Sequence, residues 1–288
     1  LAWYAERIAG GVREALGSPP VLMTEARLAV FRPGLNRGRR AGARPDPKAV
    51  VVRVSGQNLF AWYSAHATIH EADRKTLSGD WPGVVASRLG CPVLTGPIGD
   101  AAPRLIGASA EERLSAFAER FLQGSSRAVG SRMDWAGGLA FHREPVRLGP
   151  PTPHPEFASA YKVPQPLAEA AVNRFAPQGA ELTFLRLGSL LLIGFPGEPS
   201  SALGRSLESM AHRRGFETAL VVSHANGWVG YVLELADYDR GGYEGTLSFH
   251  GREASVRFVE AMARGLKQFS LERRPGHGWA KACSSGRR

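Results

Sequence analysis

Four side chains that could do chemistry either follow an apolar run or lie among glycines. His66 ends the run LFAWYSAH, and Glu198 follows the most hydrophobic run of the chain in the order GFPGE. Tyr231 and Tyr243 lie in a glycine-rich stretch after the run FETALVVS. Imidazole and carboxylate groups are common zinc ligands. A phenol can bind a metal as phenolate or donate a hydrogen bond to charge that develops on a substrate carbonyl.

Each of these residues also has a purely structural interpretation. His66 can be a hydrogen-bonded histidine at a domain edge, and Glu198 suits a helix start because the helix dipole favours acids there. The two tyrosines can pack their rings and leave their hydroxyls in water. Asp100, in the turn GDAAP, is expected to cap its own turn. The sequence contains no G-x-S-x-G elbow and no C-x-x-C or H-E-x-x-H zinc signature.

Apolar runs predict the elements that must position these residues. AVVVRV and LFAWYSAH predict one hairpin, and LTFLRL and SLLLIGF predict a second hairpin around Gly188-Ser189. FETALVVS predicts a buried strand. Helices are expected over Leu1 to Leu16, Asp80 to Leu89, Ser109 to Leu122, about fifteen residues from Pro199, and Ala254 to Phe269. Asp80 is expected to be an N-cap. This order predicts a layered α/β fold with some antiparallel hairpins.

Composition bounds the class of protein. With 288 residues and 43% hydrophobic residues, the chain can bury a sizeable core, and it has no apolar run near the roughly 18 residues of a membrane span. A net charge of +10 permits a nucleic-acid partner. The basic residues are scattered, however, and aromatic interleaving is missing, which argues against nucleic acid. Two cysteines give no disulfide framework.

Eight short segments in a fixed order resemble the neutral ceramidase family, the neutral/alkaline non-lysosomal enzymes. The segments are PGLNRGRR, DPKAVVVRV, FAWYSAHAT, SGDWPG, GPIGDAAP, FPGEPS, NGWVGYV and YEG. The resemblance runs through most of the chain. It implies a mixed layered α/β catalytic domain over residues 1–270, followed by a basic tail over residues 271–288 that we expect to be disordered. It also implies one zinc ion and cleavage of the amide bond of an N-acylated sphingoid base, or of a related N-acyl lipid.

Individual roles also follow from the resemblance. His66, Glu198 of the P-G-E motif and Tyr231 of the G-Y-V motif would bind the zinc ion. Tyr243 of the Y-E-G motif would stabilise the oxyanion, and Arg37 of the N-R motif would line the substrate entrance. Zinc lowers the pKa of a bound water from about 15.7 to about 7, so hydroxide can attack an amide near neutral pH.

The chain departs from the family pattern at three places. The family's further zinc-binding histidine lies upstream of Leu1, so we expect an N-terminally truncated catalytic domain, and the resemblance leans towards a secreted or periplasmic protein. Ala102 stands at the family's serine position, which favours a metal-activated water over a serine nucleophile. The resemblance does not extend to the C-terminal β-sandwich of longer members. An alternative hypothesis is therefore a catalytically impaired relative that keeps the fold and binds a ligand.

Overall fold

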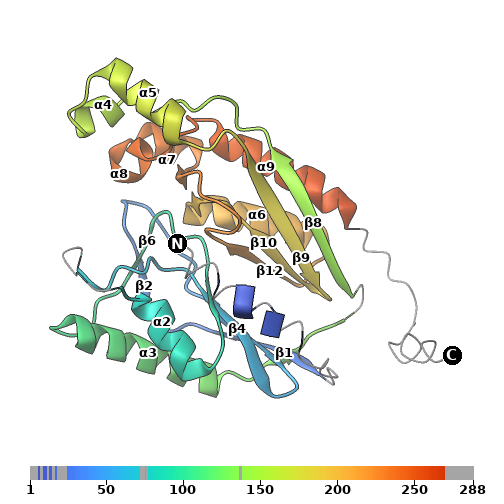
Figure 1. Ribbon diagram of the computed structural model, residues 1–288. Coiled ribbons are helices and arrows are strands. Elements are labelled where there is room, and N and C mark those ends of the chain that lie inside the picture. Colours follow the sequence, from blue (N-terminus) through green and yellow to red (C-terminus); the bar gives the residue numbers. More distant parts are fainter. Residues whose placement is uncertain are drawn as a thin grey trace.

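The computed structural model describes residues 25–71, 75, 77–135 and 138–269, together with positions 6, 9–11, 13, 14 and 17. The helix expected over Leu1 to Leu16 lies mostly outside the described residues, and the tail over 271–288 lies entirely outside them. Two main sheets form the centre, with α2 and α3 on the outer face of one and α6 and α9 on the outer face of the other (Figure 1). The mixed, layered α/β fold expected from the sequence is confirmed.

The first sheet has five strands in the order β5-β4-β3-β1-β7. Its pairs are antiparallel except for β4 and β5, which run parallel. The predicted hairpin is present, with a turn at Ser55-Gly56. The strands are β1 (Ala26–Phe31), β3 (Ala49–Val54), β4 (Gln57–Tyr63), β5 (Val93–Thr95) and β7 (Ser131–Arg132).

The second sheet has four strands in the order β12-β10-β9-β8. β10 and β12 run parallel, and the other pairs are antiparallel. The predicted hairpin around Gly188-Ser189 joins β9 to β10. The strands are β8 (Leu139–Val146), β9 (Ala180–Leu187), β10 (Leu190–Gly194) and β12 (Thr218–Val222).

The two sheets pack against each other, so their central strands are buried on both faces. In β3, Val51 joins the cluster under α2 and α3, whereas Val50 joins a cluster shared with Leu190 and Leu220 of the second sheet. The indole Nε1 of Trp62 donates across this contact to the Val221 carbonyl oxygen at 2.7 Å. Burial on both faces explains why these strands read as unbroken apolar runs.

Long helices cover the outer faces of both sheets. α3 starts with a capping box between Ser109 and Glu112, and α6 starts at an N-cap, Ser200, whose hydroxyl accepts from the Leu203 amide. Among the described residues, no helix is long and apolar enough to cross a membrane. The long helices are α2 (Asp80–Leu89), α3 (Ala110–Arg127), α5 (Gln165–Phe175), α6 (Ser201–Arg213) and α9 (Ala254–Gly265); the short ones are α4 (Phe157–Ala160), α7 (Leu235–Asp239), α8 (Gly242–Thr246) and the 3₁₀ turn η1 (Leu266–Gln268).

Two expected caps are wrong. Asp80 does not cap α2 from outside, because it has a left-handed φ of 50° inside the first turn and its carboxylate accepts from the Ile69 and His70 amides. Asp100 does not cap its own turn, because its Oδ1 accepts from the Ser201 amide at 2.7 Å. Both carboxylates therefore join segments that are distant in sequence.

Candidate active site

Two short strand pairs hold the candidate site at the ends of the main strands. β11 (Glu198–Pro199) pairs in parallel with β13 (Tyr231–Val232), with Glu198 directly opposite Tyr231. β2 (Asn36–Gly38) pairs with β6 (Ala101–Pro103). The His66 amide donates to the Ala101 carbonyl oxygen at 3.0 Å, and the Gly99 amide donates to the Pro199 carbonyl oxygen at 2.9 Å. These bonds bring His66 from the first half of the chain to Glu198 from the second.

Glycines allow these segments to approach closely. A Cβ atom on Gly197 would lie 2.7 Å from the Gly230 carbonyl oxygen, and one on Gly99 would lie 2.6 Å from the Glu198 carbonyl oxygen. Any larger residue would push β11 away from its neighbours. Gly197 and Gly99 therefore permit the close backbone approach that the site requires.

The structure brings four of the five residues singled out from the sequence together. His66 Nε2 lies 3.3 Å from Glu198 Oε2, and their side chains are only 12% and 9% exposed. The ring centres of His66 and Tyr231 are 6.3 Å apart, and those of Tyr231 and Tyr243 are 5.9 Å apart. Tyr231 is buried, whereas Tyr243 is 56% exposed. Arg37 is exposed on β2, opposite Ala102.

Burial controls the charges of this cluster. The pKa of His66 is lowered to about 4, chiefly by burial, which outweighs the opposite effect of the Glu198 carboxylate; the Arg39 guanidinium also acts to lower this pKa. Burial raises the pKa of Tyr231 above its usual range, and the Glu198 carboxylate adds to that shift. Burial alone would raise the pKa of Glu198, but hydrogen bonds from His224 and Trp228 outweigh it and lower this pKa. Near neutral pH the cluster therefore holds a neutral imidazole facing a carboxylate.

One polar atom of His66 and one of Glu198 face each other within the cluster. His66 Nε2 and Glu198 Oε2 are buried, and neither has a hydrogen-bond partner among the described residues. Buried polar atoms are normally paired, and a neutral imidazole beside a carboxylate suits a divalent cation. The described residues contain no group of three His, Cys, Asp or Glu side chains placed for a metal ion. The third donor expected from the sequence is a phenol, which is outside that set.

Sequence reasoning missed two contacts of the Glu198 carboxylate. Trp228 Nε1 donates to Glu198 Oε1 at 2.9 Å, and His224 Nε2 lies 3.3 Å from the same oxygen. His224 has a left-handed φ of 57°, which is uncommon for a residue other than glycine and often marks a functional site. No periodic pattern could have revealed these contacts, because both residues lie in the irregular loop between β12 and β13.

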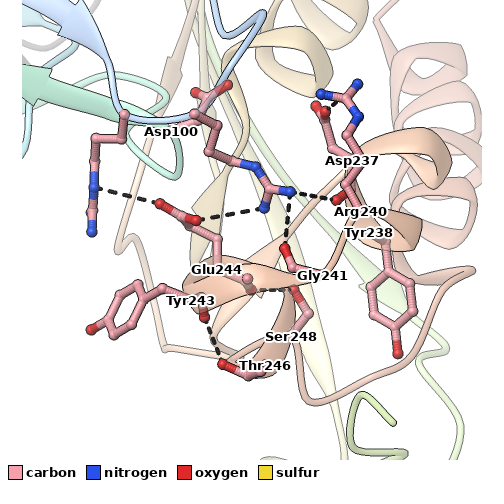
Figure 2. Close-up of polar contacts among 12 residues, drawn as sticks. Asp100, Asp237, Tyr238, Arg240, Gly241, Tyr243, Glu244, Thr246 and Ser248 are labelled. Atoms are coloured by element: carbon pink, nitrogen blue, oxygen red, sulfur yellow. Dashed lines mark hydrogen bonds and ion pairs between the residues drawn. The ribbon is translucent and has the colours of Figure 1, made fainter. Parts of the chain in front are cut away.

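Glu244, next to Tyr243 on α8, binds two arginines that follow β2. Its carboxylate lies 3.5 Å from Arg39 Nε and 3.5 Å from Arg40 Nη1. Arg40 Nη2 also donates to the Asp237 and Gly241 carbonyl oxygens, as Figure 2 shows. These contacts fix α8, and hence Tyr243, against the loop after β2.

An apolar cavity of about 250 Å³ lies on the Trp228 side of the cluster. The Trp228 indole therefore both lines this cavity and donates to Glu198. The cavity was not foreseen, because α5 lies in a segment from which the sequence predicted no helix. Its lining residues come from α4, α5 and two loops: Phe157, Tyr161, Ala171, Val172, Phe175, Ala176, Trp228, Leu247 and Phe249.

Comparisons by sequence and by structure find the same kind of relative. No family model matches the chain. The chain is 30% identical over 143 residues to the neutral ceramidase of Mycobacterium tuberculosis, a match that covers 46% of this chain and 22% of that protein. Its fold matches the crystal structure of neutral ceramidase from Pseudomonas aeruginosa with a TM-score of 0.67 at 16% identity. The chain is therefore similar to neutral ceramidases in sequence over part of its length, and in fold over most of it.

A second solved structure extends the fold comparison. A ceramidase complexed with C2 matches with a TM-score of 0.68 at 14% identity, over 90% of this chain and 56% of that one. The Pseudomonas neutral ceramidase is likewise matched over 90% of this chain and 55% of its own length. The chain thus spans about half the length of the solved ceramidases and about a fifth of the curated relative.

Proposed function

We propose that this chain carries the catalytic centre of a zinc-dependent hydrolase that cleaves the amide bond of ceramide or of a related N-acyl lipid. The observation that carries the proposal is the pair of buried atoms, His66 Nε2 and Glu198 Oε2, that face each other at 3.3 Å without a hydrogen-bond partner among the described residues, next to the Tyr231 ring. The similarity in sequence and fold to neutral ceramidases supports the choice of reaction.

Three residues of this chain would hold the zinc ion: His66, Glu198 and Tyr231. When bound, the ion supplies a Lewis acid and an activated water. Trp228 and His224 hold the other Glu198 oxygen, so they would fix the orientation of this ligand. Burial of His66 and Glu198 excludes bulk water, which strengthens electrostatic interactions at the reacting amide.

Tyr243 would act as the oxyanion donor. Its ring lies 5.9 Å from Tyr231 at the exposed side of the cluster. Its hydroxyl would donate a hydrogen bond to the amide oxygen as negative charge develops there. Arg37, exposed on β2, would line the approach. Ala102 has no hydroxyl to act as nucleophile, so attack by water is the mechanism that these residues favour.

Metal analysis of the full-length protein tests the proposal. We expect near-stoichiometric zinc, a large loss of zinc in His66→Ala and Glu198→Ala, and loss of N-acyl amide hydrolysis in both variants. His212→Ala is the matched control, because the His212 ring bonds the Phe216 carbonyl oxygen at the C-terminal end of α6, whereas Glu198 lies just before the N-terminal end of that helix. Zinc content that is indifferent to both site variants would reject the metal centre.

A second candidate function is ligand binding without catalysis, which Ala102 at the family's serine position favours. A protein of this kind would bind N-acyl lipid and leave it intact. Incubation of the zinc-loaded, full-length protein with an N-acyl amide, followed by mass spectrometry of the free fatty acid, separates the two functions. Release of fatty acid that Tyr243→Phe reduces supports the hydrolase.

A further inference from the structure

Arg39 places a positive charge beside the candidate site that the proposed chemistry does not use. Its guanidinium carbon lies 5.4 Å from the centre of the Tyr243 ring, and that ring lies 5.9 Å from Tyr231. The Arg39 side chain is 27% exposed. The Tyr243 ring therefore separates the Arg39 guanidinium from Tyr231, a predicted metal ligand. Because Arg39 is partly exposed, a substrate can reach its charge.

The charge of Arg39 is only partly neutralised. Its partner Glu244 is buried and is shared with Arg40, which is 11% exposed and also donates to two backbone carbonyl groups around α7 and α8. Two guanidinium groups and one carboxylate leave one net positive charge. Arg37 is exposed two residues earlier, so it adds to the positive potential.

The surface next to Trp228 is apolar, in contrast to the charged surface around Arg39. The Trp228 indole lines the apolar cavity between α5 and the loops, and its Nε1 donates to Glu198. An alkyl chain in this cavity would lie against the Trp228 indole, whose Nε1 bonds Glu198 at the candidate site. An amide group there would direct its amine portion along Tyr231 and Tyr243, towards Arg39.

We propose that the preferred substrate is an N-acyl amide whose amine portion carries a carboxylate, as in an N-acyl amino acid, with that carboxylate bound by Arg39. Guanidinium groups bind carboxylates with charge-assisted hydrogen bonds. The apolar cavity holds the acyl chain. This inference rests on the proposed function for the presence of an amide, but it concerns recognition of the amine portion and is tested by binding.

Two probes of nearly equal size test the inference. N-dodecanoylglycine carries the carboxylate, and N-dodecanoylethanolamine replaces it with a neutral hydroxymethyl group. We would measure the Kd of each by calorimetry on the zinc-loaded, full-length protein at low ionic strength. We expect about tenfold tighter binding of the glycine conjugate, the size of one charge-assisted contact, and a preference that shrinks as salt is added.

Three variants assign the preference to Arg39. Arg39→Gln should reduce the ratio of the two Kd values to about one, and Arg39→Lys should retain part of it because a charge remains. Arg120→Gln, which removes an exposed charge on α3, should leave the ratio at its wild-type value. Melting temperatures of all variants show whether the fold is kept.

Each outcome decides one of the two proposals. Equal affinity for the two probes, or a preference that survives Arg39→Gln, overturns the inference and leaves the proposed hydrolase intact. Selective binding of the glycine conjugate without release of fatty acid supports the inference and rejects the hydrolase. Failure to bind either probe also overturns the inference, because the cavity would then not bind the acyl chain and Arg39 would not bind the carboxylate.

Discussion

Replacing Lys48 by Met should destabilise the protein strongly, because it leaves a buried acid without its counter-charge. Lys48 Nζ lies 2.9 Å from Glu208 Oε2 and 3.0 Å from Asp46 Oδ2. The Glu208 side chain, on α6, is only 7% exposed, and its other oxygen accepts from the Val221 amide. Methionine keeps most of the volume of lysine, so the variant tests the charge.

The magnitude follows from the burial of Glu208. Removing one partner of a buried ion pair costs roughly 3–5 kcal/mol, and the partial exposure of Lys48 places the expected loss near the lower end, at about 3 kcal/mol. For a domain of this size that corresponds to a decrease in melting temperature of about 6–12 °C. Urea denaturation monitored by circular dichroism measures the free energy of unfolding. Lys267→Met, which removes an exposed lysine, should change it little.

The loss of stability caused by Lys48→Met should also depend on pH. Burial raises the pKa of Glu208, whereas Lys48 lowers it, so this pKa rises further in the variant. A carboxyl whose folded pKa exceeds its unfolded pKa favours folding at low pH and loses that contribution as the pH rises. The deficit should therefore be larger at about pH 8 than at about pH 5.

A double variant completes the test. Glu208→Gln in the Lys48→Met background removes the buried charge, and its amide oxygen can still accept from Val221. It should restore most of the lost stability. A loss below about 1 kcal/mol, a loss that is equal at both pH values, or no recovery in the double variant would each refute the electrostatic explanation.

Three further outcomes are expected. Gly197→Ala should cost about 1–3 kcal/mol, because the new Cβ atom would lie 2.7 Å from the Gly230 carbonyl oxygen; an unchanged melting temperature would contradict this. Burial lowers the pKa of His250 from 6.5 to about 4. The free energy of unfolding of the wild type should therefore decline by up to about 3 kcal/mol as the pH falls between these two values. The variant His250→Leu should show a flatter dependence of the melting temperature on pH. Trp228→Phe keeps the ring but removes the donor to Glu198, so zinc affinity measured against a chelator should fall about 10- to 100-fold, whereas Trp135→Phe should leave it unchanged.

The sequence predicted the central strands well because burial on both faces leaves unbroken apolar runs. β3, β10 and β12 are of this kind, and the turn at Gly188-Ser189 is marked by its own residues. The amphipathic α9 was equally clear. α5 was missed because it lies between segments rich in proline and glycine, where no apolar period stands out.

The candidate site was only partly visible in the sequence, for a different reason. Motif resemblance singled out His66, Glu198 and the two tyrosines, which the structure brings together. Arg39 and Trp228 lie within two of the resembling segments and His224 lies outside them. None of the three was singled out, because their contacts depend on which loops meet after the sheets have packed. Asp80 and Asp100 were misjudged for the same reason, since each carboxylate binds backbone amides of a segment remote in sequence.

The division of the chain between the sheets has consequences for assembly. The first sheet uses only residues 26–132 and the second only residues 139–222, with a separate hydrophobic cluster beneath the helices of each. His66 belongs to one half, and Glu198 and Tyr231 to the other. The proposed ligands therefore meet only when the two halves have docked, so metal uptake would report the completion of folding and would lock the halves together.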